Sequence, residues 1–68
     1  MYYLNEEGKK LLSNFKLARI AKMIGINAST LNDIVKRDRR CMKLTAYCLT
    51  KLLNEDAEIE QYFIREDK

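Results

Sequence analysis

The most distinctive chemistry in this sequence is a concentration of cationic side chains in its middle section. Between Lys16 and Lys51 there are nine basic residues and two acidic ones, which gives a net charge of +7. The residues before Lys16 are neutral in sum, and those from Leu52 onward have a net charge of −4. Positive charge gathered in one section is typical of a protein that binds a polyanion, while the acidic end segment indicates a different role for another face.

The nucleophilic side chains, by contrast, lack the partners that catalysis or metal binding requires. The sequence contains no histidine, so Ser29 and Thr30 have no imidazole base, and we expect no enzyme activity. Cys41 and Cys48 are seven residues apart rather than in a CxxC pattern, which predicts neither a metal site nor a cofactor. On one helix they would lie about 10 Å apart along the axis, too far for a disulfide. We expect both to be reduced, small core residues.

A chain of 68 residues is expected to form one domain, here residues 1–68, because its apolar residues cannot fill two cores. The N-terminal residues lack the basic start and apolar run of a signal peptide, and no apolar stretch approaches the roughly 18 residues of a membrane span. We therefore expect a cytoplasmic protein without a membrane partner. A core of this size rarely contributes more than about 3–5 kcal/mol, so self-association is the expected supplement.

Apolar residues recur at helical spacing along the whole chain, which predicts an all-α fold of five helices. With no proline and only two glycines, nothing indicates a linker or a set of β-hairpins. The first helix is predicted to start at Asn5, whose side chain can cap it, and to end near Ser13. The second is predicted to begin at residue 14 or 15. Its apolar stripe is Leu17, Ile20, Ala21 and Ile24.

Gly25 is predicted to end the second helix, because glycine takes the left-handed conformation most easily. A third helix, capped by Asn27 or Ser29, is predicted to run to about Lys36. Its inward residues are Leu31, Ile34 and Val35. The apolar stripe of a fourth helix is Cys41, Leu44, Cys48, Leu49 and Leu52. A fifth helix is predicted from about Asp56 to Arg65, with Ile59, Tyr62 and Phe63 buried.

Residues 17–35, LARIAKMIGINASTLNDIV, resemble the helix-turn-helix of the phage repressor and Cro family, also called the XRE-like family. Counted from Leu17, that family's pattern has a small residue at the fifth position and glycine at the ninth, which here are Ala21 and Gly25. Its apolar positions match Ile20, Ile24, Ile26, Leu31 and Ile34. A small side chain lets the two helices approach where they cross, and glycine allows the sharp turn between them. The resemblance implies a compact five-helix, lambda-repressor-like DNA-binding domain.

In the family that this run resembles, the third helix lies in the major groove of DNA. The positions that contact base edges correspond to Ala28, Ser29, Asn32 and Asp33. Phosphate contacts would come from seven cationic residues: Lys16, Arg19, Lys36, Arg37, Arg39, Arg40 and Lys43. Two features depart from the family pattern. Leu17 stands where many members have a phosphate-binding polar residue, and no glycine follows the third helix near residue 37.

These features predict sequence-specific binding of double-stranded DNA by a Cro-like transcriptional repressor. By the same resemblance, two copies would occupy half-sites of a pseudo-palindromic operator about one helical turn apart. The predicted homodimer contact is apolar and C-terminal, formed by Tyr62, Phe63 and Ile64 with Tyr47 as an addition.

Two other functions compete with this interpretation. A protein-binding module of the same fold, such as a phage-encoded repressor antagonist, an antitoxin or an inhibitor of a host defence nuclease, is favoured by the acidic end segment and by Leu17. A nonspecific architectural protein would bind DNA tightly without sequence preference. Substitution of Asn32 separates the sequence-specific reader from both alternatives, because only such a reader would lose discrimination at one base pair.

Overall fold

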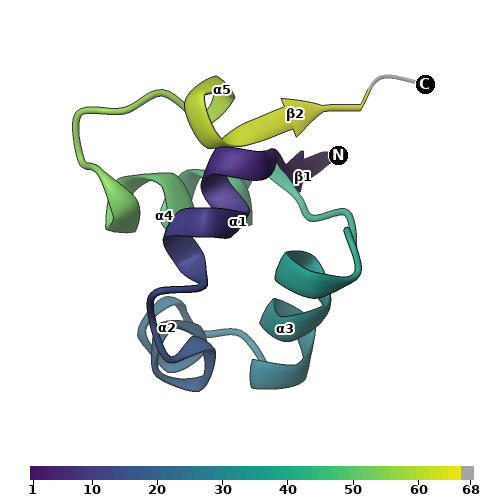
Figure 1. Ribbon diagram of the computed structural model, residues 1–68, viewed down its shortest axis with the longest axis vertical. Coiled ribbons are helices and arrows are strands. Elements are labelled where there is room, and N and C mark those ends of the chain that lie inside the picture. Colours follow the sequence, from purple (N-terminus) through teal and green to yellow (C-terminus); the bar gives the residue numbers. More distant parts are fainter. Residues whose placement is uncertain (67–68) are drawn as a thin grey trace.

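The computed structural model describes residues 1–66 and contains five helices and one two-stranded antiparallel sheet (Figure 1). In chain order these are β1 (Tyr2–Leu4), α1 (Glu6–Leu12), α2 (Leu17–Ile24), α3 (Ala28–Lys36), α4 (Lys43–Leu53), α5 (Ile59–Tyr62) and β2 (Phe63–Arg65). The sheet overturns the all-α, lambda-repressor-like fold class expected from the sequence, although the chain is mostly helical. Asp67 and Lys68, which belong to the acidic end segment, lie outside the described residues.

The sheet joins the two ends of the described chain. β1 and β2 pair antiparallel, with Tyr2 opposite Arg65 and Leu4 opposite Phe63. The prediction of a fifth helix reaching Arg65 is therefore wrong: α5 ends at Tyr62, and Phe63 is extended, with φ −129° and ψ 151°. Strands of three residues are too short to show an alternating pattern in the sequence. Here the backbone N–H and C=O groups of each strand bond to the other strand, at the opposite end of the described chain.

Local signals place the first three helices. The Asn5 side chain accepts a hydrogen bond of 2.8 Å from the Gly8 N–H, which confirms the predicted cap of α1. α2 begins at Leu17, later than predicted, because the N–H groups of residues 14 and 15 still donate to carbonyl oxygens of α1 (3.2 and 3.1 Å). Gly25 closes α2 with φ +79°, as predicted. α3 follows with Asn27 in the N-cap position, but the Asn27 side chain makes no capping hydrogen bond.

The apolar stripe predicted for the fourth helix is confirmed at Leu49, which is buried, and at Leu52, which packs against the core, but it is wrong at its N-terminal end. Cys41 lies before α4, where its N–H and C=O both bond to Tyr2 (2.8 Å each), and Leu44 is 71% exposed. α4 instead buries the face formed by Ala46, Leu49 and Thr50. The bridge to Tyr2 keeps residue 41 extended, so the helix starts only at Lys43. Packing against the rest of the core then decides which of its faces is buried.

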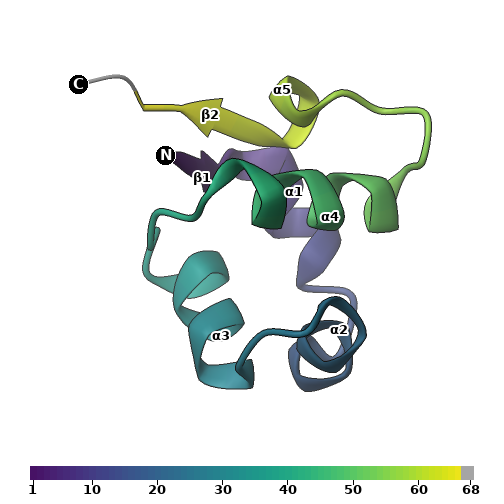
Figure 2. The same ribbon diagram turned by 180° about the vertical axis from the view of Figure 1, so that it is seen from behind.

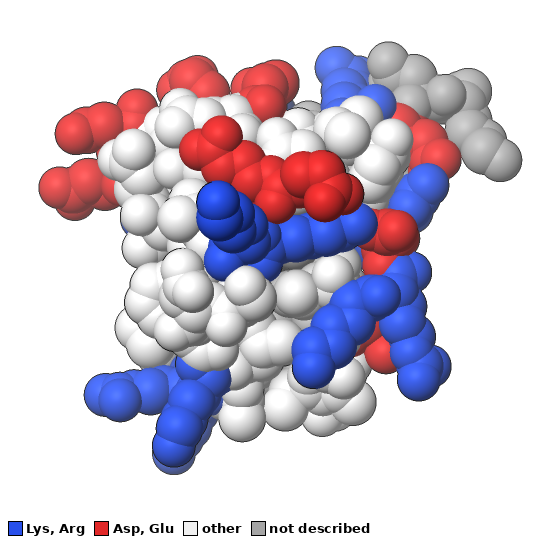
Figure 3. Space-filling model, in the orientation of Figure 1, with Lys and Arg blue, Asp and Glu red and all other residues white. Residues whose placement is uncertain are grey.

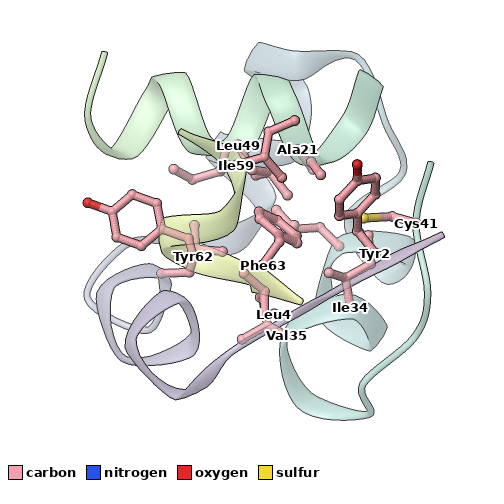
Figure 4. Close-up of a cluster of buried hydrophobic side chains, with 14 of the residues drawn as sticks. Tyr2, Leu4, Ala21, Ile34, Val35, Cys41, Leu49, Ile59, Tyr62 and Phe63 are labelled. Atoms are coloured by element: carbon pink, nitrogen blue, oxygen red, sulfur yellow. The ribbon is translucent and has the colours of Figure 1, made fainter. Parts of the chain in front are cut away.

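The core draws side chains from all of these helices and strands (Figure 4). Leu4 and Phe63 are partners across the sheet and are among the largest fully buried residues. Tyr62 and Phe63 are 3% and 2% exposed, so they hold the C-terminal segment to the protein's own core. The dimer contact predicted from the sequence is therefore not available to these two residues, and only Ile64 of the three is exposed.

Candidate nucleic-acid interface

Helices α2 and α3 form one end of the molecule, away from the sheet (Figures 1 and 2). Residues 25–27 join them, and within this turn the Ile26 N–H donates to the Ala21 carbonyl (2.9 Å) while Gly25 is left-handed. Ala21 is 1% exposed, so its small side chain is enclosed by the core. A turn this short holds the outer side of α3 in a defined orientation relative to α2.

The outer side of α3 is open and carries short side chains. Ala28, Ser29 and Asn32 are exposed, and their spacing puts them on one face of the helix. Neither Ser29 nor Asn32 uses its side chain in a hydrogen bond within residues 1–66. Three of the four residues predicted to read bases therefore lie together, with their polar groups accessible to a partner.

The fourth predicted base reader, Asp33, is engaged with arginine side chains of its own chain. Its two carboxylate oxygens lie 3.9 Å from Arg37 Nε and 3.7 Å from Arg39. Its carbonyl oxygen accepts hydrogen bonds from the N–H groups of both residues (2.8 and 3.2 Å). The side chain of Asp33 is 34% exposed. This geometry suits the orientation of two arginines better than the reading of a cytosine.

Exposed cations come before and after the open face of α3 in the chain. Lys16 and Arg19 come from the start of α2, while Lys36, Arg37 and Arg39 follow at the end of α3. The side chain of Arg37 is 80% exposed and that of Arg39 is 54% exposed. Figure 3 shows Lys and Arg over α2 and beside α3, and a group of Asp and Glu at the opposite end over the turn before α5, with further acidic side chains beside basic ones between these two ends. The molecule is thus electrically polarised, with the α2–α3 end positive.

Arg40, predicted to bind phosphate, is committed to the fold. Its guanidinium pairs with both carboxylate oxygens of Glu66 (2.9 and 3.1 Å), donates to the Asp38 carbonyl (2.6 Å) and lies 4.0 Å from the centre of the Tyr3 ring. The hydrogen bond to Glu66 raises the pKa of Arg40 above its usual range. Arg40 therefore ties the loop after α3 to both ends of the chain. Lys43, the last predicted phosphate ligand, is exposed at the start of α4.

Asp38 and Lys9 were not anticipated as partners of this interface. Asp38 has φ +53°, in the left-handed region that residues other than glycine adopt at a cost. Its carboxylate pairs with Lys9 of α1, and this hydrogen bond raises the pKa of Lys9. The missing glycine was the signal in the sequence. An aspartate tolerates this backbone conformation better than most residues, and here it also anchors the loop to α1.

Comparison of the chain with known protein families, with curated proteins and with solved structures finds no match. Within residues 1–66, no three side chains capable of binding a metal ion come together. Each helix in the same range falls short of the length and apolar character needed to cross a membrane.

Proposed function

We propose that this protein binds double-stranded DNA in a sequence-specific manner and acts as a Cro-like transcriptional repressor, with α3 in the major groove. One observation carries the proposal: the open face of α3, formed by Ala28, Ser29 and Asn32, is preceded in the chain by exposed cations of α2 and followed by exposed cations at the end of α3 and in the next loop. A helix with short side chains on its outer face can approach base edges closely, while flanking cations contact the phosphates on either side of the groove.

The side chains of α3 match the donors and acceptors of the major groove. Asn32 can pair bidentately with adenine, Ser29 can donate or accept a hydrogen bond, and Ala28 can contact a thymine methyl group. Lys36, Arg37 and the remaining exposed cations would neutralise phosphates, a contribution that is independent of sequence and decreases with salt.

Binding to duplex DNA over a salt series tests the proposal, with the target duplex first selected from a random pool. Asn32→Ala should lose discrimination at one base pair by about 1–3 kcal/mol. Arg37→Ala should weaken binding to every duplex and reduce the slope of log affinity against log salt by about one. Gln61→Ala, an exposed residue on α5, serves as the matched control and should bind as the wild type does.

Each alternative result has a clear meaning. Tight binding without sequence preference, unchanged by Asn32→Ala, would replace the repressor with an architectural DNA-binding protein. Absence of duplex binding even at low salt would refute the DNA proposal altogether.

The second candidate function is binding of another protein, such as a repressor or a host nuclease. It is favoured by exposed acidic side chains at the end of the molecule opposite α2 and α3, namely Glu55, Asp56, Glu58 and Glu60. Leu17, half-buried at the start of α2, also lacks the phosphate-binding group that the family pattern has there. If the variants Asn32→Ala and Arg37→Ala both act in cells as the wild type does, protein binding replaces DNA binding as the proposed function.

A further inference from the structure

The outer face of α4 is apolar and unusually open. Leu44 is 71% exposed and Tyr47 is 49% exposed, and Cys48 is partly exposed beside them. Positions 44, 47, 48 and 51 form one stripe along the helix, on the side away from the buried face. Met42, in the N-cap position, adds a further side chain that is 67% exposed. Apolar side chains gathered in this way on a small protein mark a contact surface.

Lys51 is the one cation of this stripe, and burial of the stripe by a partner would not leave its ammonium group without hydrogen bonds. Its ammonium group donates to the carbonyl oxygens of Glu55 and Ala57 (3.2 and 2.8 Å), so the charge is turned toward the end of the helix. The same nitrogen lies 5.4 Å from the centre of the Tyr47 ring. A partner that covers the stripe would therefore meet an aromatic ring and an aliphatic stem, not an uncompensated ammonium group.

The charges at the two ends of α4 indicate what the partner is. Lys43 is exposed at the N-terminal end, and Glu55 and Asp56 are exposed just beyond the C-terminal end. If a second copy packs its α4 antiparallel to the first, each Lys43 lies beside the acidic pair of the other copy. A parallel arrangement would instead bring like charges together. The stripe is thus complementary to itself under a two-fold rotation, which is the condition for an isologous contact.

We propose that two copies of this protein associate through the outer faces of their α4 helices, packed antiparallel about a two-fold axis near Tyr47 and Cys48. α4 crosses the middle of the molecule, and α2 and α3 lie below it in the view of Figure 2. The pair would be the homodimer that a repressor needs to occupy two half-sites. Only this use of the pair rests on the proposed function. Its existence is tested without DNA.

The contact surface available to the pair is small. A standard interface buries about 800 Å² per partner, which is about one sixth of the 4806 Å² surface of this chain. One face of an 11-residue helix is smaller than that. We therefore expect dissociation in the micromolar range, with monomer and dimer both populated at accessible concentrations.

Sedimentation equilibrium of the full chain over a wide concentration range tests the proposal. The wild type should show a monomer–dimer equilibrium, and Leu44→Glu should raise the dimer dissociation constant by at least about tenfold. Lys43→Glu should weaken the pair, and the triple variant K43E/E55K/D56K should restore it, because the charges are then exchanged symmetrically. Ile64→Glu, at the exposed position of the C-terminal segment, is the control and should leave the equilibrium unchanged.

A second readout reports proximity at the axis. A short bis-maleimide cross-linker should join two copies through Cys48, and Cys48→Ser should abolish the product. Monomer at every concentration, or dissociation by Ile64→Glu but not by Leu44→Glu, would overturn the proposal. Circular dichroism of each variant checks that it is folded. Because Leu44 and Lys43 are exposed, their substitution leaves the core intact, and charge exchange tests the contact independently of the Leu44 variant.

Discussion

The two cysteines of this chain occupy different environments. Cys41 is 6% exposed and is held by its backbone bonds to Tyr2, while Cys48 lies partly exposed on the outer face of α4. Burial raises the pKa of the Cys41 thiol from 9.0 to about 11, because a thiolate would lose its hydration there. Only Cys41 is thus the small core residue that the sequence predicts for both.

The raised pKa of Cys41 makes stability depend on pH in the alkaline range. The folded state keeps the thiol protonated above the pKa of the unfolded chain, so its contribution to stability is complete below pH 9.0 and is lost as the pH rises toward about 11. Denaturant unfolding of the wild type should show this decrease in excess of that shown by Cys41→Ala. Identical pH profiles for the two proteins would contradict it.

Thiol labelling provides the companion test at neutral pH. Cys48 should react with a maleimide in the native state, whereas Cys41 should react only when the protein unfolds.

At the scale of the elements, the turn between α2 and α3 depends on one backbone conformation. Gly25 has φ +79°, and a Cβ built at this position would meet no atom within 4 Å. A side chain at position 25 would therefore meet no steric clash, and its cost would come only from the left-handed backbone conformation. At Gly8 the situation is reversed, because an added Cβ would lie 2.6 Å from the Tyr62 carbonyl oxygen, where α1 packs against α5.

Gly25→Ala should lower the free energy of unfolding by about 1 kcal/mol, because a side chain disfavours the left-handed conformation. Gly25→Asn should cost less, since asparagine tolerates this conformation. Denaturant titration of both variants measures the difference. Gly8→Ala should destabilise more than Gly25→Ala, and the opposite order would show that the α1–α5 contact relaxes easily.

At the scale of the whole molecule, the loop after α3 is tied to both ends of the chain. Tyr2 and Cys41 exchange backbone hydrogen bonds, Arg40 pairs with Glu66 and stacks on Tyr3, and the Glu66 N–H donates to the Met1 carbonyl (2.8 Å). The sheet, the loop and the end of α3 therefore support one another. The cations that follow α3 are consequently presented from a fixed segment.

Arg40→Ala should lower the thermal unfolding midpoint and reduce hydrogen-exchange protection in β1 and β2, because it removes the side-chain links from the loop to Tyr3 and Glu66. Arg37→Ala removes a side chain that is 80% exposed, so it should leave both measurements unchanged while weakening DNA binding. If Arg40→Ala were as stable as the wild type and as weak in DNA binding as Arg37→Ala, Arg40 would be a phosphate ligand and not a structural link.

The local features of this protein follow from the sequence by itself. Asn5 caps α1, Gly25 ends α2, and the apolar spacing of α3 leaves Ala28, Ser29 and Asn32 outside. Each depends on interactions within one or two helical turns, which residue type and spacing specify directly.

Only the tertiary structure decided the strands, the buried face of α4, the burial of Tyr62 and Phe63, and the engagement of Asp33 and Arg40. Most of these features depend on contacts between segments far apart in the chain, such as Tyr2 with Arg65 or Arg40 with Glu66. Short strands and ion pairs leave no periodic trace in the sequence. Their energy exists only once the folded core has brought the two segments together.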